Sequence, residues 1–444
     1  MASSVKRLVV IFFAALFAGL LTGCLGAITD ELYAIPKGAK EYEKLQERIN
    51  EVLDAGAVYA PPIIGVNRQS VQLRDLDGDG VSEAIVFFLT KEDKPLKIYV
   101  FSKTEDDYEV SIIIEGIGTA IDSIRYIDMN GDGWAEIVVG WQMSPSLKQL
   151  SICSIKDYHL FQLAASDYKA FSVVDINGDG YDDVLAVRLD AAGTAGEVTY
   201  FSLMTDGEIV SGYAALSQGV EQISRVLSGR LTSGAQALFV ESAYEQTGVI
   251  TDVFSWRNNH LENITLRSDT GASSDTMRMM RYYSSDVNKD GIIDIPIPRP
   301  LPAQSETTYY AIEWYNVTLG GRAEISFVSY HNYSDSWYLV LPMTWQKDVT
   351  VRRDDTVAGE RHVVFSYCSG DGEVIDFLKI YTLSGDNKED RAAMENRFVL
   401  LENANTIYAA EFLKSSGLVL PGLNEELITR NFHIIYSDWI TGVI

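Results

Sequence analysis

One nine-residue phrase occurs four times in this chain of 444 residues, and a strand-like apolar run follows each copy. In every copy, positions 1, 3, 5 and 9 carry Asp, Asn or Glu, and position 6 is Gly. The copies are DLDGDGVSE (75–83), DMNGDGWAE (128–136), DINGDGYDD (175–183) and DVNKDGIID (286–294). Four copies with one arrangement of oxygen-bearing side chains indicate a repeated structural unit, and this repetition limits the possible folds more than any other feature of the sequence.

The arrangement within each copy is the one that a hard cation requires. Alternate side chains can converge on one point, Gly lets the backbone turn sharply, and the carbonyl at position 7 can add a ligand. We therefore predict about four structural Ca²⁺ ions, because Mg²⁺ demands rigid octahedral geometry and keeps its water. The predicted ligands, with position 7 contributing its carbonyl, are Asp75, Asp77, Asp79, Val81 and Glu83; Asp128, Asn130, Asp132, Trp134 and Glu136; Asp175, Asn177, Asp179, Tyr181 and Asp183; and Asp286, Asn288, Asp290, Ile292 and Asp294.

Two other interpretations of the phrase fail. An EF-hand loop starts in the same way, but it needs a carboxylate at position 12 and a following helix. Position 12 here is Val86, Val139, Ala186 or Ile297, and the flanking residues alternate as in strands. Stretches rich in Asp and Gly also form simple hairpin turns, but a turn does not explain the acid shared at position 9.

The repeated unit extends beyond the loop. An apolar strand precedes each loop and three further strands follow it, as in EAIVFF, KIYVFS and EVSIII after the first loop. Two decayed copies, 229–237 and 354–362, keep the Gly and the flanking strands but have lost the ligand pattern. Four short strands per unit, at a spacing of roughly fifty residues, predict an all-β fold: a β-propeller of six to seven four-stranded blades.

We place the propeller at residues 61–396. Residues 24–60 are expected to form a tether and a short helix, because apolar residues recur at helical spacing before Gly56. These residues are Tyr42, Leu45, Ile49, Val52 and Leu53. Residues 397–444 mix strand-like and helical patterns, so either a last irregular blade or an α+β closing cap fits them.

The N-terminus predicts export. Lys6 and Arg7 precede an apolar run over 8–21, which suits a secretory signal and is short for a membrane span. The sequence from Leu21 to Cys24 resembles the lipobox of bacterial lipoproteins. This implies a signal peptide over 1–23 and a lipidated Cys24, which would hold the chain on the extracytoplasmic face of the bacterial cytoplasmic membrane as a cell-surface lipoprotein. An uncleaved anchor and a plain secretory signal are the alternatives.

Composition excludes several classes of protein. A net charge of −26 argues against a nucleic-acid partner, since little in the chain could neutralise phosphates. Besides Cys24 there are only Cys153 and Cys368, which lie in apolar runs and are expected as buried thiols, although a disulfide between them stays open. The five histidines show no metal-ligand spacing, and no GxSxG, Walker or GxGxxG motif is present, so we predict no catalytic residue.

The phrase D-x-[DN]-G-D-G-x-x-[DE] followed by an apolar strand resembles the VCBS and FG-GAP-type repeats of bacterial surface proteins and the propeller of integrin α-chains. The resemblance covers roughly residues 65–385. It implies a β-propeller in which Ca²⁺ ions lie in blade loops and act structurally. The chain departs from the family in two respects: it has no clear Phe-Gly…Gly-Ala-Pro segments, and its copies at 229 and 354 have lost their ligands. Ligand recognition of the integrin kind is therefore not carried over.

These features together predict a membrane-anchored binding or scaffold module for a protein or glycan partner that the sequence does not identify. The aromatic cluster of residues 330–345 is the candidate contact surface, and buried packing between blades is its alternative explanation. The alternative function is a cell-envelope or carbohydrate-active enzyme that uses carboxylates in the propeller channel.

Overall fold

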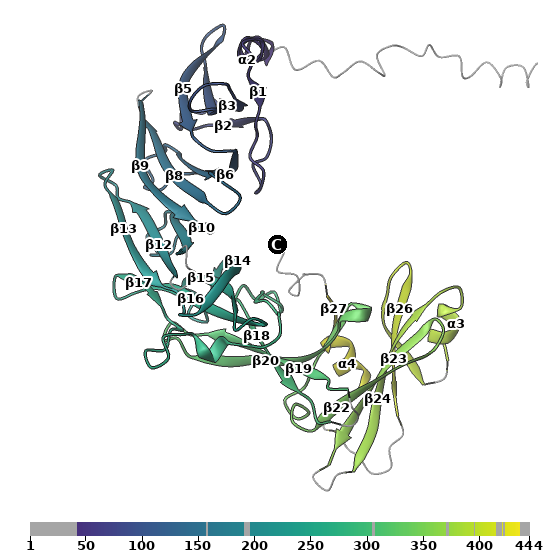
Figure 1. Ribbon diagram of the computed structural model, residues 1–444. Helices are drawn as coiled ribbons and strands as arrows, with labels where there is room; N and C mark the ends of the chain where they lie inside the picture. The colour runs from purple at the N-terminus through teal and green to yellow at the C-terminus, as the bar shows by residue number, and fades with distance from the viewer. Residues whose placement is uncertain are drawn as a thin grey trace, which may run out of the picture.

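The computed structural model describes residues 42–156, 159–190, 196–303, 307–369, 373–394, 396–413, 420 and 422–435. Within them the strands form six antiparallel sheets that follow one another along the chain (Figure 1). The prediction of an all-β chain built from repeated antiparallel blades is confirmed; in the described residues three of the six sheets have the predicted four strands and three have five. The signal peptide and Cys24 lie outside the described residues, and no described helix is long and apolar enough to cross a membrane.

The first three sheets each contain one intact copy of the phrase between their first and second long strands. The first sheet consists of β1 (Val58–Tyr59), β2 (Val71–Arg74), β3 (Glu83–Leu89), β4 (Leu96–Lys103) and β5 (Tyr108–Gly116). The second contains β6 (Ala120–Ile127), β7 (Glu136–Gln142), β8 (Lys148–Lys156) and β9 (His159–Tyr168). The third contains β10 (Ala170–Val174), β11 (Asp183–Leu189), β12 (Gly196–Leu203) and β13 (Ile209–Ala215).

The last three sheets are less regular. The fourth contains β14 (Val220–Arg230), β15 (Gln236–Tyr244), β16 (Gly248–Arg257) and β17 (His260–Asn263). In the fifth, β18 (Ile295–Pro300), β19 (Tyr310–Val317), β20 (Ala323–Asn332) and β21 (Trp337–Val340) are joined by β27 (Phe432–Ile434). The sixth has the order β22 (Val349–Val357), β23 (Glu360–Cys368), β24 (Val374–Ser384), β26 (Thr406–Phe412) and β25 (Arg397–Glu402).

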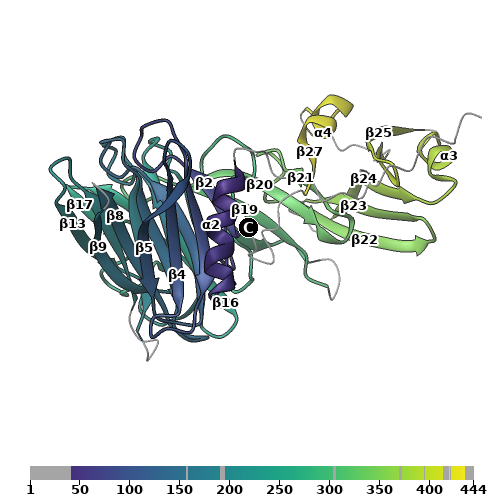
Figure 2. The same ribbon diagram turned by 90° about the horizontal axis from the view of Figure 1, so that it is seen from above.

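Adjacent sheets pack face to face, and each interface has its own apolar core (Figure 2). The second strands are buried on both faces, which explains their continuous apolar sequences. In β3, Ile85 and Phe87 pack toward the second sheet, whereas Ala84, Val86 and Phe88 belong to a separate cluster on the opposite face. Because side chains alternate between the two faces of a strand, one strand thus serves two cores.

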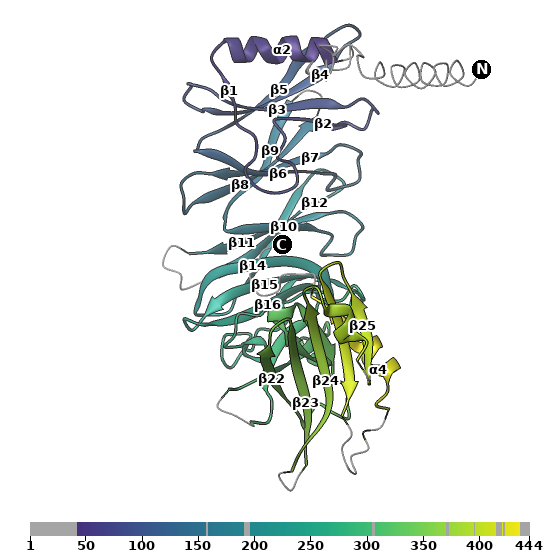
Figure 3. The same ribbon diagram turned by 90° about the vertical axis from the view of Figure 1, so that its right-hand side faces the viewer.

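Helix α2 (Glu43–Asp54) covers that opposite face of the first sheet (Figure 3). Leu45 and Ile49 are the buried residues of the helix, and Gly56 has a φ of 100° just beyond its end. The predicted helix and its apolar face are therefore confirmed. In a closed propeller, this face of the first blade would pack against the last blade, but here the helix occupies it.

The six sheets accordingly trace an arc in which the first and the sixth lie apart (Figures 1 and 3). Among the described residues, no strand of the first sheet pairs with a strand of the sixth. The chain thus has propeller-like blades, and closure into a ring is absent from the described part of the structure. The arrangement is that of a repeat array in which each unit contacts its neighbours.

Residues after 396 are shared between two sheets. Strands β25 and β26 extend the sixth sheet next to β24, and β27 adds to β21 in the fifth. The helices α3 (Lys388–Ala392) and α4 (Glu425–Asn431) lie between these strands in the sequence, and two single-turn 3₁₀ helices occur earlier, η3 (Ser274–Thr276) and η4 (Tyr333–Asp335). These C-terminal strands link the last two blades.

The aromatic residues proposed as a contact surface are mostly buried. Trp337 and Trp345 are fully buried, and Tyr330 and Tyr338 nearly so, in the cores of the fifth and sixth sheets. Their alternative explanation, packing between blades, is therefore the correct one. Cys153 is buried, Cys368 is partly exposed, and the two do not form a disulfide.

The fourth sheet, whose loop has lost the ligand pattern, contains a fully buried ion pair. Glu241 on β15 accepts hydrogen bonds from Arg278 Nη2 at 2.7 Å and from the backbone N–H and hydroxyl of Ser284, each at 2.7 Å. These bonds fasten the irregular segment between β17 and β18 to the sheet. A buried carboxylate needs such partners because its charge is costly to remove from water.

We predict that Arg278→Ala lowers the free energy of unfolding by about 3–5 kcal/mol, because it leaves the Glu241 carboxylate buried without its counter-charge. Arg267→Ala is the control: this arginine belongs to the same segment, but its ion pairs with Asp269 and Asp275 are exposed, so a much smaller change is expected. Urea denaturation of both variants measures the difference, and equal effects would contradict a structural role for the buried pair.

Candidate metal sites in the blade loops

The four intact loops share one hydrogen-bond pattern, which begins with the acid at position 9. This residue is the first residue of β3, β7 or β11, or directly precedes β18, and in each case it is buried. Its carboxylate accepts the backbone N–H of position 2 of the same loop. The donors and distances are Leu76 to Glu83 at 2.9 Å, Met129 to Glu136 at 3.0 Å, Ile176 to Asp183 at 3.0 Å and Val287 to Asp294 at 3.1 Å.

The carboxylate at position 1 fixes the turn of the loop. It accepts the N–H of the Gly at position 6, with distances of 3.0 Å at Gly80, Gly133 and Gly180 and 2.9 Å at Gly291. The acid at position 5 in turn accepts the N–H of position 7, at 2.6–2.9 Å. The side chains at positions 1, 5 and 9 are therefore oriented by the backbone itself. The carbonyls of Val81, Trp134, Tyr181 and Ile292 stay predicted ligands.

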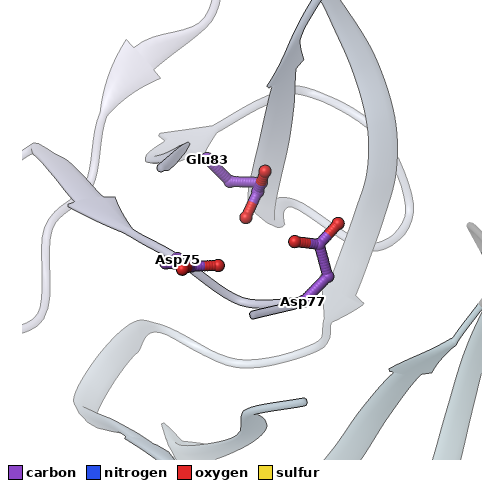
Figure 4. A group of neighbouring side chains, drawn as sticks. All are labelled: Asp75, Asp77 and Glu83. Carbon is purple, nitrogen blue, oxygen red and sulfur yellow. The ribbon is translucent and has the colours of Figure 1, made fainter. Parts of the chain in front are cut away.

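The first loop brings three acids closest together. Oxygens of Asp75, Asp77 and Glu83 lie within 4.8 Å of one another, and Figure 4 shows the carboxylates turned toward a common space. No other group of three acidic, histidine or cysteine side chains in the described ranges meets this distance. Three like charges at this separation repel one another unless a cation or protons neutralise them. The donor set thus fits a hard cation such as Ca²⁺.

The other three loops have Asn at position 3, and this amide donates a hydrogen bond to the acid at position 5. The donor–acceptor distances are 3.3 Å from Asn130 to Asp132, 2.9 Å from Asn177 to Asp179 and 2.8 Å from Asn288 to Asp290. The predicted ligand positions of each of these loops therefore hold one carboxylate fewer than those of the first loop. In these three loops the side chains at positions 3 and 5 are therefore linked directly, and those at positions 1, 5 and 9 are held by the backbone N–H groups described above.

Burial changes the acidity of the carboxylates at position 9. It raises the pKa of Glu83 to about 7, that of Asp183 to about 6 and that of Asp294 to about 7. The pKa of Glu136 is raised for the same reason. The bond from position 2 opposes this rise, and the neighbouring acids of the loop add to it. A bound cation would stabilise the ionised form that burial disfavours.

The backbone turns at two positions of the loop. Position 6 has positive φ in all four loops, as the sequence predicted, but position 4 does too. Gly78, Gly131 and Gly178 occupy position 4 in the first three loops, whereas the fourth has Lys289 with a φ of 61°. The Gly that recurs at position 4 in three of the four copies therefore also occupies a position of positive φ.

Consecutive loops also contact one another, which the sequence did not reveal. The N–H of Ala135, at position 8 of the second loop, donates to the carbonyl of Leu76, at position 2 of the first, at 2.8 Å. The same two positions are joined between the fourth intact loop and the decayed copy before it, where Ile293 donates to Arg230 at 3.2 Å. The loops thus form a row along one side of the blades.

The decayed copies keep the turn without the ligands. Gly234 and Gly359 retain positive φ of 83° and 76° at position 6. Position 9 is the buried Ala237 in one copy and His362 in the other, with His362 Nε2 at 3.8 Å from Asp354. Neither copy has the acid that the intact loops bury at this position. The geometry therefore supports four candidate cation sites, in the intact loops.

Comparisons with solved structures give distant likenesses. A functionally unknown protein from Desulfotomaculum acetoxidans DSM 771 has a TM-score of 0.27 and 12% identity, with 69% of this chain and 84% of that chain covered. The exotype rhamnogalacturonan lyase YesX has a TM-score of 0.29 and 11% identity, with 71% of this chain and 74% of that chain covered. No curated protein matches the sequence.

The match to a protein family falls on the first two intact loops. Residues 75–139, which include both loops and most of the sheet between them, match the family model described as FG-GAP-like repeat. This match confirms the resemblance that the nine-residue phrase had indicated. Over residues 75–139, the chain carries an FG-GAP-like repeat.

Proposed function

We propose that this protein is a lipid-anchored, extracytoplasmic binding or scaffold module whose blades are stabilised by Ca²⁺ in four loops. One observation carries the proposal: four loops bury an acid at position 9 and orient it, with the acids at positions 1 and 5, by the same hydrogen bonds. The three carboxylates within 4.8 Å in the first loop support it further. The sequence up to Cys24 supports the anchor, and the FG-GAP-like repeat supports a binding or scaffold role.

Calcium would join the two strands that each loop connects. In the first three loops, positions 1 and 9 lie at the end of one strand and the start of the next, so an ion bound to both would tie the two strands together where the carboxylates would otherwise repel. In the fourth loop the same positions flank the isolated bridge between Ser285 and Asp294. Calcium sites of extracellular modules typically have a Kd of about 10⁻⁴–10⁻³ M. They are filled outside the cell and largely empty inside it, so the ion would favour the folded state after export.

We expect EDTA to lower the melting temperature and Ca²⁺ to restore it. Each site contributes on the order of 1 kcal/mol when free Ca²⁺ is a few times its Kd, so four sites contribute several kcal/mol to the folded state. Differential scanning calorimetry in EDTA, in Ca²⁺ and in Mg²⁺ measures the effect. Melting that is unchanged after full chelation would refute the calcium proposal, and equal restoration by Mg²⁺ would refute the choice of ion.

The dependence on pH follows from the raised pKa values at position 9. In the metal-free protein, Glu83, Asp183 and Asp294 have a folded-state pKa of about 6 to 7, against about 4 in an unfolded chain. Their contribution to stability is full below about pH 4 and is lost as the pH rises toward 7, because the unfolded state then holds fewer protons than the folded one. Calcium binds the ionised form, so its stabilising effect should grow over this interval. Chemical denaturation with and without Ca²⁺ at pH 5.5 and pH 7.5 tests this, and a larger calcium effect at pH 5.5 would contradict it.

The variant Glu83→Gln distinguishes two roles of Glu83: binding a cation through its charge and accepting the hydrogen bond from Leu76 that joins two strands. The Gln carbonyl can still accept the N–H of Leu76, but the side chain loses the charge that would bind a cation. We expect isothermal titration to find one calcium site fewer, with little loss of stability in EDTA. Asp106→Asn removes an exposed acid outside the loops and should leave the number of sites unchanged. If Glu83→Gln keeps every site, the assignment of Glu83 as a ligand is wrong.

A further inference from the structure

A cavity of about 360 Å³ lies between the second, third and fourth sheets, at the end opposite the candidate metal sites. The second and third loops lead into β7 and β11, whereas the cavity is lined by the turn between β7 and β8 and by Leu189, the last residue of β11. Residues 221–223 of β14 also line it. Figure 1 shows β6, β10 and β14, the first strands of these sheets, on the inner side of the arc. The cavity is therefore separate from the loops.

The lining of this cavity is mostly polar, and its charged groups come from three sheets. Lys148 is the first residue of β8, Lys169 lies directly before β10, and Glu221 lies on β14. Ser146 and Gln222 add groups that can both donate and accept hydrogen bonds. Two lysines thus share one cavity in a chain whose net charge is −26. A cavity of this size with convergent polar groups is typical of a site for a small ligand.

Two β-bulges lie at this end of the sheets. Strand β6 has one at Asp122, where its register against β7 shifts, and β14 has one at Glu221, where its register against β15 shifts. Strand β10, between them, pairs with β11 without a shift. Bulges redirect side chains and are frequent next to active sites. The two redirected residues are the acid beside Lys148 and the acid in the lining itself.

Asp122 holds the side chain of Lys148 at the cavity. Its buried carboxylate accepts the Tyr168 hydroxyl at 2.7 Å and lies 2.8 Å from Lys148 Nζ. Gly140 makes room for this arrangement, because a Cβ atom there would collide with the Tyr168 hydroxyl oxygen. The ammonium group of Lys148 is therefore fixed before any ligand arrives, and such preorganisation lowers the entropic cost of binding.

Lys169 has a neutral partner. Its Nζ donates to the carbonyl oxygen of Ser146 at 2.8 Å, and within the described ranges it forms no ion pair with a carboxylate. An ammonium group has three N–H donors, so further donors remain for a ligand. An anionic group that enters the cavity would therefore meet the charge of Lys169 without displacing an ion pair.

We propose that this cavity binds an acidic sugar residue of a glycan, a ring that carries hydroxyl groups and one anionic group. The inference rests on the proposed binding role and specifies its partner, but it does not require Ca²⁺. The anionic group pairs with Lys169 and Lys148 through charge-assisted hydrogen bonds. The hydroxyl groups of the sugar donate to Glu221, and the C–H groups of the ring pack against Leu189 and Ile223.

The lining favours such a sugar over an acidic peptide. Glu221 is exposed and accepts the backbone N–H of Gln246 at 3.2 Å, so its carboxylate can accept further donors from a ligand. A sugar presents hydroxyl donors close to its anionic group, whereas an acidic side chain presents acceptors only. The apolar part of the lining is limited to Pro145, Leu189 and Ile223, which is little for the side-chain anchors of a bound peptide.

The test begins with the full-length protein on a glycan array in Ca²⁺. The array holds oligosaccharides of uronic acids, the same oligosaccharides with their carboxyl groups reduced to alcohols, and phosphorylated oligosaccharides beside their unphosphorylated forms. We expect binding to an acidic form that is about tenfold tighter than binding to its neutral counterpart, because the neutral form lacks the charge-assisted contacts. The same comparison identifies the anionic group as a carboxylate or a phosphate.

Two pairs of variants locate the site, and isothermal titration with the strongest glycan of the array measures them. Lys169→Gln should weaken binding about tenfold, whereas Lys91→Gln, at an exposed lysine in the turn after β3, should leave it unchanged. Ser146→Trp places a bulky side chain in the cavity and should abolish binding. Leu147→Trp, at an exposed neighbour that does not line the cavity, should not. Melting temperatures of all four variants check that they fold.

The outcomes separate this inference from the proposed function. A lack of binding to every acidic glycan overturns the sugar site and leaves the calcium proposal intact, because melting in EDTA tests calcium independently. Equal binding of acidic and neutral forms overturns the part played by the lysines, and binding that survives Ser146→Trp overturns the location. Glycan binding that follows the predicted pattern, in a protein whose melting does not respond to EDTA, supports this site and refutes the calcium proposal.

Discussion

A buried carboxylate at the start of the second strand of a blade is the constraint on which the rest of this structure depends. In the first three sheets it is the acid at position 9, which accepts the N–H of position 2 and so joins the end of one strand to the start of the next. The fifth sheet has the same bond from Val287 to Asp294, directly before its first strand β18. Burial makes the ionised carboxylate unfavourable, so either a proton or a bound cation must neutralise its charge. The fourth sheet has Ala237 at this position and instead buries Glu241 further along the same strand, opposite Arg278. Each of these blades therefore buries a carboxylate with hydrogen-bond partners: a backbone N–H of the loop at position 9, or Arg278 and Ser284 at Glu241.

The contacts between loops extend this constraint from one blade to the next. In the first loop, Leu76 donates its N–H to Glu83 of the same loop and accepts the N–H of Ala135, from the second loop, at its carbonyl. A change in the charge of Glu83 therefore acts on a residue that the second loop also holds. This arrangement connects the first two blades through their loops, in addition to the apolar core between their sheets.

The sequence predicted the parts of the fold that are encoded locally. The strands around each loop follow from alternation and from continuous apolar runs. The decayed copies are recognisable because they retain Gly234 and Gly359 and the flanking strands, and the structure gives both glycines positive φ. Helix α2 was evident from its spacing, but its place was not, because the pattern of Leu45 and Ile49 says that a face is buried and not what covers it. The aromatic residues around Trp337 could have been surface or core for the same reason, and the structure places them in the core.

The candidate metal sites likewise combine features that the local sequence predicts with features that depend on how the blades pack. The ligand types and their order within one loop could be read directly, since all of them lie within nine residues. The contact between loops could not, because Ala135 and Leu76 are adjacent only once two blades have packed. A cavity of about 810 Å³ beside the fourth loop is lined by residues from 286 to 435, and no local sequence pattern relates Lys289 to Phe432 on its wall.

The helix that covers the first sheet also gives the array a direction of assembly. Helix α2 and the first sheet precede the other described elements in the chain, so they emerge first during synthesis, with one face already sheltered by the helix and one face bare. Each later sheet covers the bare face of its predecessor and exposes one of its own, so the growing chain never presents more than one unprotected apolar face. Only the last step departs from this order, because β27 returns across nearly one hundred residues to join β21. A closed ring would have to keep its first face exposed until its last blade arrived, and that long exposure is what favours aggregation.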